Sequence, residues 1–278
     1  MNSLSYRNSL RSGQRTAMLG TAMAEAAASF GMRRLRSHGS RALGVRERAN
    51  WLQDAASTAL QRIGVEVVAD GDPPRHGLMV SNHLSYLDVL AYASTMPCAF
   101  VAKQEVRGWP VFGAFATMAG TIYVNRARGA ANGGAVRSIE EALAAGVPVV
   151  LFPEGTSSDG STVLPFHARF FEPAIHAGAP VTAAAIGYAS STAEEAALAY
   201  HGDDIFGAHL MLTLGQRSLT ARVAFATAAK RYADRKEAAR ATRAEVEVLR
   251  GMAAGRRTAI QPAAQLLQSE THTLTHAG

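Results

Sequence analysis

Short apolar runs alternate with amphipathic segments along most of this chain. The runs are rich in Val, Ile and Ala and end at polar or turn-forming residues, which is the pattern of buried strands. The runs that predict strands are Val65–Val68, Gly77–Val80, Cys98–Ala102, Gly120–Val124, Val147–Phe152, Val181–Tyr188 and Leu219–Phe225. The segments that predict helices are Thr16–Phe30, Arg46–Ile63, Asp88–Thr95, Pro110–Met118, Val136–Ala145, His167–His176, Ile205–Leu214 and Ala233–Arg250. Strands that alternate with helices predict an α/β fold, with a sheet of mostly parallel strands flanked by helices.

The two ends of the chain differ from its middle in composition. We expect an N-terminal helical extension over residues 1–64, one domain over 65–254 and a loose tail over 255–278. The first helix of the extension is followed by several Arg residues, and the apolar residues on one side of it are Leu19, Ala22, Met23, Ala26 and Phe30. This segment fits two interpretations: a helix on an anionic membrane surface, or an extension that packs on the protein or stays disordered.

The charge of the chain is basic. It has 28 Lys and Arg residues against 22 Asp and Glu, which gives a net charge of +6. A basic chain favours an anionic partner such as a lipid surface or a phosphorylated substrate. Nucleic acid is disfavoured because no run of interleaved aromatic and basic residues is present. A single cysteine, Cys98, excludes an internal disulfide and a multi-cysteine zinc site, and it fits a reducing compartment.

Neither a membrane span nor a secretion signal is evident in the sequence. No run of 18 or more apolar residues is present, so we predict no transmembrane helix. The Ala-rich run near the N-terminus contains Glu25 and lacks a clear cleavage region, and it therefore fits a signal peptide poorly.

His83 and Asp88 stand five positions apart, where the strand Gly77–Val80 runs into the next helix. Loops at such corners often carry the chemistry of a protein. A carboxylate can orient one nitrogen of an imidazole so that the other nitrogen takes a proton from a hydroxyl group. The pair therefore predicts a general base that acts on a hydroxyl of the substrate. Taken alone, the pair also fits a helix-capping Asp beside a surface His.

Three more charged residues, Lys103, Arg126 and Glu154, closely follow predicted strands. Ligands of such sheets bind beyond the carboxyl ends of the strands, so we expect these residues to converge with His83 on one rim. Lys103 and Arg126 fit the grip on an anion such as phosphate, although each also fits a solvated cation at a strand end. Glu154 fits a partner for hydroxyl groups or a cation, or an exposed turn carboxylate, and Gly155 lets a ligand approach the backbone.

Four segments, in order, resemble the motifs of the glycerolipid acyltransferase family, typified by bacterial 1-acyl-glycerol-3-phosphate acyltransferases. They are Asn82–Asp88 (NHLSYLD, for the motif NHxSxxD), Lys103 with Gly120–Arg126 (GTIYVNR), Phe152–Ser158 (FPEGTSS) and, more loosely, Ala179–Ala183 (APVTA). The resemblance covers roughly residues 77–190. One such motif would be a weak signal, whereas four in the same order are a specific one.

The resemblance implies an O-acyltransferase that moves a fatty acyl group from a thioester to the hydroxyl of a lysophospholipid, such as 1-acyl-glycerol-3-phosphate. The donor would be acyl-coenzyme A or acyl carrier protein, with no metal and no organic cofactor. The family's usual hydrophobic N-terminal anchor is not evident here. The resemblance therefore implies peripheral attachment to the cytoplasmic face of the cell membrane, in contact with anionic lipid.

The resemblance also implies roles for the residues. His83, oriented by Asp88, would deprotonate the acceptor hydroxyl, which then attacks the thioester. The residues that it places at the acceptor site are Lys103, Arg126, Glu154, Gly155 and Thr156.

Two positions depart from the family pattern. Ser157 stands where the family often has Arg, and His167 stands where it often has Lys. Together with the segments 156–160 (TSSDG) and 163–166 (VLPF), they are similar to the branch that contains lyso-ornithine lipid acyltransferases. An aminolipid acceptor is therefore the alternative to a phosphate-bearing one. A catalytically silent lipid-binding protein and a hydrolase that uses the same base on water are the alternatives from other classes.

Overall fold

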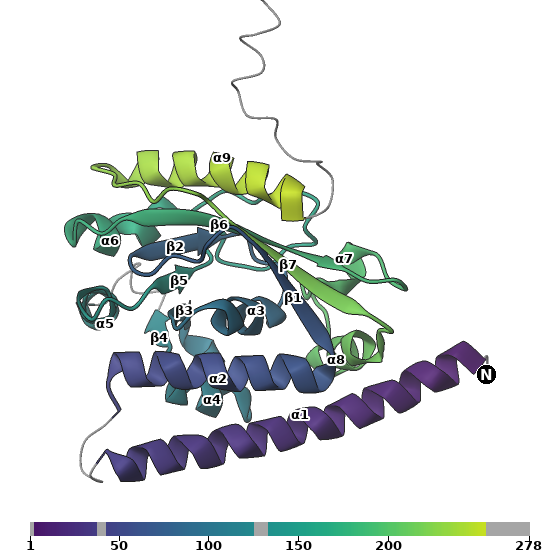
Figure 1. Cartoon of the computed structure of the whole chain (residues 1–278). Coiled ribbons are helices and arrows are strands. Elements are labelled where there is room, and N and C mark those ends of the chain that lie inside the picture. Colours follow the sequence, from purple (N-terminus) through teal and green to yellow (C-terminus); the bar gives the residue numbers. More distant parts are fainter. Residues whose placement is uncertain (1–2, 38–42, 125–132, 254–278) are drawn as a thin grey trace, which may run out of the picture.

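The computed structural model describes residues 3–37, 43–124 and 133–253. Within these residues, seven strands form one sheet in the order β1-β7-β6-β2-β5-β3-β4 (Figure 1). The strands are β1 (Val65–Asp70), β2 (Leu78–Ser81), β3 (Ala99–Lys103), β4 (Ile122–Val124), β5 (Val149–Leu151), β6 (Val181–Ala189) and β7 (Leu219–Phe225). Every apolar run that predicts a strand therefore forms one.

The strand directions place five carboxyl ends along one edge of the sheet. The pairs β2–β5, β2–β6, β3–β5 and β3–β4 are parallel, and β1 is parallel to β7. Only the pair β6–β7 is antiparallel among the described strands. The predicted α/β fold with a mostly parallel sheet is confirmed. In register, Val80 on β2 pairs with Leu151 on β5 and Ala183 on β6, so the loops after these strands leave the sheet side by side.

Helices cover both faces of the sheet (Figure 1). They are α1 (Ser3–Arg36), α2 (Val45–Ile63), α3 (Leu87–Thr95), α4 (Phe112–Met118), α5 (Gly133–Ala144), α6 (Glu172–His176), α7 (Glu195–Leu198), α8 (Phe206–Gly215) and α9 (Arg235–Ala253), with 3₁₀ turns at Gln104–Gly108 and Ala168–Phe171. On one face, α2 and α3 bury Trp51 and Tyr92 against strand residues such as Ile186. On the other face, α5, α6 and α9 bury residues such as Phe171 and Ala238 against Val80 and its neighbours.

Two predicted helices differ in extent from the observed ones. The segment His167–His176 is a 3₁₀ turn followed by the short α6, because Pro173 lies in the first turn of α6. Proline has no backbone N–H, so it is tolerated at a helix start but would break a helix that continued through it. The helix predicted over Thr16–Phe30 is longer, since α1 runs from Ser3 to Arg36 as one helix.

The apolar side of α1 faces the protein. Ala22 and Ala26 are buried, Leu19 and Phe30 pack against the core, and the indole Nε1–H of Trp51 donates a hydrogen bond to the Ala26 carbonyl (3.0 Å). α1 also packs on α8, near the start of α1. This side of α1 is therefore used for packing on the protein. Any membrane contact of α1 must involve its opposite side.

No helix within the described ranges combines the length and the apolar character that crossing a membrane requires.

Candidate active site

The corner between β2 and α3 is fixed by hydrogen bonds across the sheet. The side chain of Asn82, next to the predicted base, donates to the Ile186 carbonyl (3.0 Å) and accepts from the Ile186 amide (2.9 Å). Both groups are buried, and an amide side chain that replaces a strand partner in this way pins the end of β2 to β6. The backbone position of His83, the next residue, is therefore fixed relative to β6.

His83 and Asp88 meet as predicted. The Nδ1 atom of His83 lies 2.7 Å from Oδ2 of Asp88. The Asp88 side chain is fully buried, whereas the His83 side chain remains 23% exposed. A buried carboxylate stays ionised only when its oxygens are well partnered. Here Oδ2 also accepts from the backbone amides of Leu84 (2.7 Å) and Ser85 (3.1 Å). An ionised Asp88 accepts the Nδ1–H of His83, which leaves the His83 Nε2 lone pair available.

The ring of His83 lies flat on that of Phe152. Their centroids are 4.1 Å apart and their planes differ by 13°. Phe152 directly follows β5, the neighbour of β2, so the loop after β5 covers one face of the imidazole. Together with the Asp88 contact, this stacking restricts the ring to one orientation.

Tyr188, near the end of β6, completes the surroundings of Asp88. Its hydroxyl donates to Oδ1 of Asp88 at 2.6 Å, and both side chains are buried. Burial and the charge of Asp88 raise the pKa of Tyr188 well above its ordinary value, so the phenol keeps its proton. The sequence did not predict a role for this residue. Its only signal was its place at the end of the predicted strand Val181–Tyr188, which begins within the fourth motif.

Glu154 follows β5 and is buried, in contrast to an exposed turn carboxylate. Neither of its carboxylate oxygens has a hydrogen-bond partner within the described part of the chain. Burial raises the pKa of Glu154 to about 8, opposed in part by the nearby backbone amides of His83 and Leu164 and reinforced by the charge of Asp88. At neutral pH this carboxyl is therefore mostly protonated, beside an ionised Asp88.

The loop after β5 packs on the corner between β2 and α3. The Ser158 amide donates to the His83 carbonyl (3.0 Å), which ties the loop to the base. Gly155 is buried with φ of 75°, a backbone conformation that side-chain-bearing residues rarely adopt. Thr156, the next residue, is exposed on the outside of the same turn. The far end of the loop is held by Arg250 on α9, which donates to the Gly160 carbonyl (3.2 Å).

Of the two predicted anion-binding residues, one can be placed. Lys103 ends β3 and is exposed. Since β5 lies between β2 and β3, Lys103 stands two strands from His83 along the same edge, a separation of about 10 Å. Arg126 lies outside the described residues.

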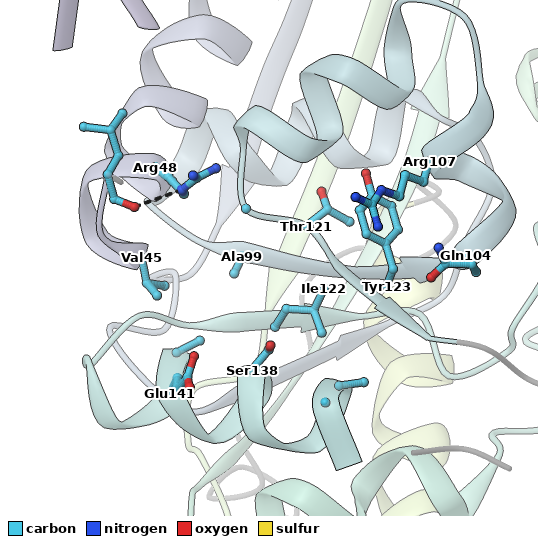
Figure 2. Close-up of a pocket in the computed structure, with 15 residues that line it drawn as sticks. Val45, Arg48, Ala99, Gln104, Arg107, Thr121, Ile122, Tyr123, Ser138 and Glu141 are labelled. Carbon is cyan, nitrogen blue, oxygen red and sulfur yellow. Dashed lines mark hydrogen bonds between the residues drawn. The ribbon is translucent and has the colours of Figure 1, made fainter. Parts of the chain in front are cut away.

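A cavity of about 460 Å³ lies beside the edge strand β4, between α2 and α5 (Figure 2). Its polar lining includes Arg48, Arg107 and Glu141, and it contains none of the predicted site residues that fall within the described ranges. Arg48 donates to the carbonyls of Leu43, Thr117 and Met118, so it serves the packing of this region. The His83–Asp88 pair is therefore at the strand ends and apart from this cavity.

The described residues hold no group of three or more His, Cys, Asp or Glu side chains with the geometry of a metal site. The chemistry that the corner itself supports is proton removal from a hydroxyl or water by Nε2 of His83, with the imidazolium stabilised by Asp88.

Comparison with known proteins agrees with these motifs. Residues 64–187 match the family model described as Acyltransferase. The 1-acyl-sn-glycerol-3-phosphate acyltransferase of Neisseria meningitidis serogroup B is 37% identical over 164 residues, which is 59% of this chain and 64% of that protein. The lyso-ornithine lipid O-acyltransferase of Pseudomonas aeruginosa is 35% identical over 158 residues, 55% of this chain and 59% of that protein. The chain thus spans somewhat less than two thirds of these relatives.

A solved structure shares the fold. The crystal structure of the 1-acyl-sn-glycerophosphate (LPA) acyltransferase PlsC from Thermotoga maritima superposes with a TM-score of 0.66. The match covers 92% of this chain and 100% of that one, at 18% sequence identity.

Proposed function

We propose that this chain, whose residues 64–187 match the Acyltransferase family model, transfers a fatty acyl group from a thioester to the hydroxyl of a lysophospholipid. The product from 1-acyl-glycerol-3-phosphate is phosphatidic acid. The observation that carries the proposal is the His83–Asp88 pair, in which a buried carboxylate orients a partly exposed imidazole. The donor is acyl-coenzyme A or acyl carrier protein.

The reaction needs one base and no enzyme nucleophile. Nε2 of His83 takes the proton of the acceptor hydroxyl as its oxygen attacks the thioester carbonyl. The new C–O bond forms and the C–S bond breaks. The leaving thiolate then takes the proton from the imidazolium, which restores the base. Asp88 favours the step because its negative charge stabilises the transient imidazolium.

The acceptor head lies along the strand ends beyond His83. Lys103 and Arg126 supply positive charge for its phosphate, and exposed Thr156 offers a hydroxyl. Glu154 and Gly155 form the floor of this site. The unpartnered, protonated carboxyl of Glu154 supports a polar contact with the acceptor, since a hydroxyl group that reached it would supply the missing hydrogen bond.

A lyso-ornithine lipid is the second candidate acceptor. Two observations favour it: Ser157 replaces the Arg that is common in the family, and relatives named lyso-ornithine lipid O-acyltransferase match this chain at 34–46% identity over shorter stretches. The Ser157 hydroxyl donates to the Tyr200 carbonyl (2.5 Å) and therefore does not replace a cationic head-group contact.

The deciding experiment offers both acceptors to one preparation of the purified chain. Labelled palmitoyl-coenzyme A is incubated with lysophosphatidic acid, with lyso-ornithine lipid, or with neither, and the lipids are separated. Label in phosphatidic acid supports the first acceptor, and label only in ornithine lipid supports the second. Free labelled fatty acid formed without an acceptor would instead indicate a hydrolase. Because acyl carrier protein is an alternative donor, the assay is repeated with palmitoyl-acyl carrier protein.

Replacement of the base tests the mechanism. His83→Ala is expected to lower turnover by a factor on the order of 10²–10⁴, because proton removal from the hydroxyl is lost while lipid binding persists. The matched control is His176→Ala. His176 is exposed at the end of α6, just before β6 begins, and thus at the opposite edge of the sheet from His83. Turnover that stays near normal in His83→Ala would remove the base assignment and favour a protein that only binds lipid.

Membrane attachment belongs to the same proposal, with residues 1–64 as the membrane-facing part and 65–254 as the catalytic part. α1 lies along the outside of the molecule, on the far side from α9 (Figure 1). Its outward residues include the exposed apolar side chains of Leu10, Met32 and Leu35, with Arg34 and Arg36 near one end. Apolar side chains flanked by Arg fit an anionic lipid surface, such as the cytoplasmic face of the cell membrane.

Charge on this side of α1 should weaken vesicle binding. Leu35→Glu is expected to weaken binding to anionic phospholipid vesicles about tenfold, because it removes an apolar contact and adds repulsion. Flotation or sedimentation with vesicles measures the effect. Val248→Glu is the control, since Val248 is similarly apolar and 44% exposed but lies on α9, across the sheet. Equal loss in both variants, or in neither, would rule out α1 as the membrane-facing element.

A further inference from the structure

Asp88 receives hydrogen bonds from two separate sources. Oδ2 accepts from His83 and from two backbone amides of its own turn. Oδ1 accepts from the Tyr188 hydroxyl at 2.6 Å, and this is its one hydrogen bond within the described residues. The turn between β2 and α3 therefore supplies the donors for Oδ2, and a strand residue 100 positions later supplies the donor for Oδ1.

The geometry points to Tyr188 as a positioning residue that sets the basicity of His83 through Asp88. The hydroxyl of Tyr188 fixes the plane of the carboxylate and draws negative charge toward Oδ1, away from the oxygen that faces the imidazole. It does not contact the substrate. The inference rests on the proposed function for its activity readout, but the titration of His83 can be followed without any activity.

Tyr188 is itself held firmly. Its backbone amide donates to Oε1 of Glu195 (2.7 Å), and Oε2 of Glu195 pairs with Arg250 (2.5 Å). Arg250 is 6% exposed and also binds the Gly160 carbonyl, so α9, α7 and the loop after β5 all converge on this strand. A phenol on such a support keeps its direction toward Asp88.

The other ionisable groups around the pair must be separated from the effect of Tyr188. Those that face it from neighbouring elements are Glu154 after β5, Tyr92 on α3, Tyr86 at the start of α3 and Arg250 on α9. Glu154 matters most, because its carboxyl titrates near pH 8, within the range to be measured. The His83 titration is therefore also recorded in a Glu154→Gln background.

Loss of the phenol hydroxyl should make His83 hold its proton more tightly. In Tyr188→Phe, Oδ1 of Asp88 loses its donor, so more negative charge is available to stabilise the imidazolium. The midpoint of the His83 titration and the acidic limb of the kcat/KM profile should both move up by about one pH unit. Below that limb the base is protonated and inactive, so turnover near neutrality falls and recovers at higher pH.

Tyr92→Phe is the matched control. Tyr92 is also fully buried near the site, but its hydroxyl bonds to Ser81 (2.6 Å) and not to Asp88. Both variants lose one buried hydroxyl and one hydrogen bond, so a merely structural effect would appear in both. Only Tyr188→Phe should shift the titration of His83. The resonance of His83 in protein with isotope-labelled histidine is assigned by its loss in His83→Gln.

A third variant reverses the sign and does not depend on the folding of Tyr188→Phe. A tyrosine at 188 with a ring fluorine beside the hydroxyl is a stronger hydrogen-bond donor, so the His83 midpoint should move to lower pH. Shifts of opposite sign in the phenylalanine and fluorotyrosine proteins support the inference. An unmoved midpoint in either protein, or an equal shift in Tyr92→Phe, overturns it.

The experiments distinguish a failure of the proposed function from a failure of the role inferred for Tyr188. If no acyl transfer is found but the midpoints shift as described, Tyr188 still tunes the pair and only the reaction is wrong. If transfer is found and the midpoints stay fixed, the reaction stands and the role of Tyr188 is wrong.

Discussion

Two neighbouring carboxyl groups, Asp88 and Glu154, differ in the hydrogen bonds that this fold provides for them. Both are buried, and both follow strands that pair directly with each other, β2 and β5. Asp88 accepts hydrogen bonds from an imidazole, two backbone amides and a phenol. Glu154 has no hydrogen-bond partner for either oxygen among the described residues, and burial raises its pKa to about 8.

The difference shows how one rim can hold a charged and a neutral acid. A buried carboxylate costs several kcal/mol unless hydrogen bonds replace its lost hydration. The turn after β2 supplies those bonds because its backbone amides point inward at Asp88. The turn after β5 supplies no hydrogen bond that reaches Glu154 in normal geometry. The protonated form of this carboxyl is therefore lower in free energy than the ionised form at neutral pH. The surroundings, and not the type of side chain, assign the charge.

The same chemical change at the two sites should therefore have unequal effects. In Asp88→Asn, the two backbone amides keep the amide oxygen where Oδ2 was, so His83 retains its tautomer but loses the charge that stabilises the imidazolium. We expect turnover to fall by a factor on the order of 10²–10³. In Glu154→Gln, a neutral group replaces a neutral acid, and we expect a loss of about tenfold or less at pH 7.

Acyl transfer by the two purified variants and the wild-type chain measures this contrast at one pH. Circular dichroism confirms that each variant is folded. Comparable losses in the two variants would contradict the assignment of charge to Asp88 alone. A larger loss in Glu154→Gln than in Asp88→Asn would move the catalytic role from the first loop to the second.

The sequence predicted the strands and loops that carry this site better than the burial and the contacts of the side chains within it. The strands could be predicted because apolar runs of four to eight residues that alternate with amphipathic segments are typical of buried strands. The order of the motifs along these strands predicted His83, Asp88 and Glu154 near strand ends. Burial of Glu154 was not readable, since an acidic residue between Pro and Gly is typical of an exposed turn. The depth of a turn below the surface depends on which loops cover it, and that is fixed by contacts far apart in the chain.

Long-range partners explain the other gaps. Tyr188 reaches Asp88 because β6 pairs with β2, a pairing that periodicity alone does not reveal. The apolar side of α1 was readable as apolar, but the sequence did not say whether lipid or protein covers it. α2 covers it, through contacts such as that of Trp51 with Phe30, whose ring centroids are 5.1 Å apart. The prediction for Arg126 lies outside the described residues, so it stays a proposal.

The last expected effect is a pH dependence of stability that belongs to Glu154. Its carboxyl ionises near pH 4.5 in the unfolded chain and near pH 8 in the folded one. Between these values the folded state holds a proton that the unfolded state has released, so the free energy of unfolding falls as pH rises. The slope is at most on the order of 1.4 kcal/mol per pH unit. This contribution is fully present below pH 4.5 and is lost through pH 8.

Urea unfolding of wild type and Glu154→Gln between about pH 5 and pH 8 isolates that slope, because Gln does not titrate. The variant should gain stability relative to wild type as pH rises. Asp159→Asn is the control: Asp159 lies in the same loop, and hydrogen bonds from Ser161 hold the pKa of its exposed carboxyl below the ordinary value. A lowered pKa gives a contribution already complete above pH 5, so its difference from wild type should stay flat. A flat difference for Glu154→Gln as well would mean that Glu154 is ionised in the folded chain, and the contrast with Asp88 would then be one of partners and not of charge.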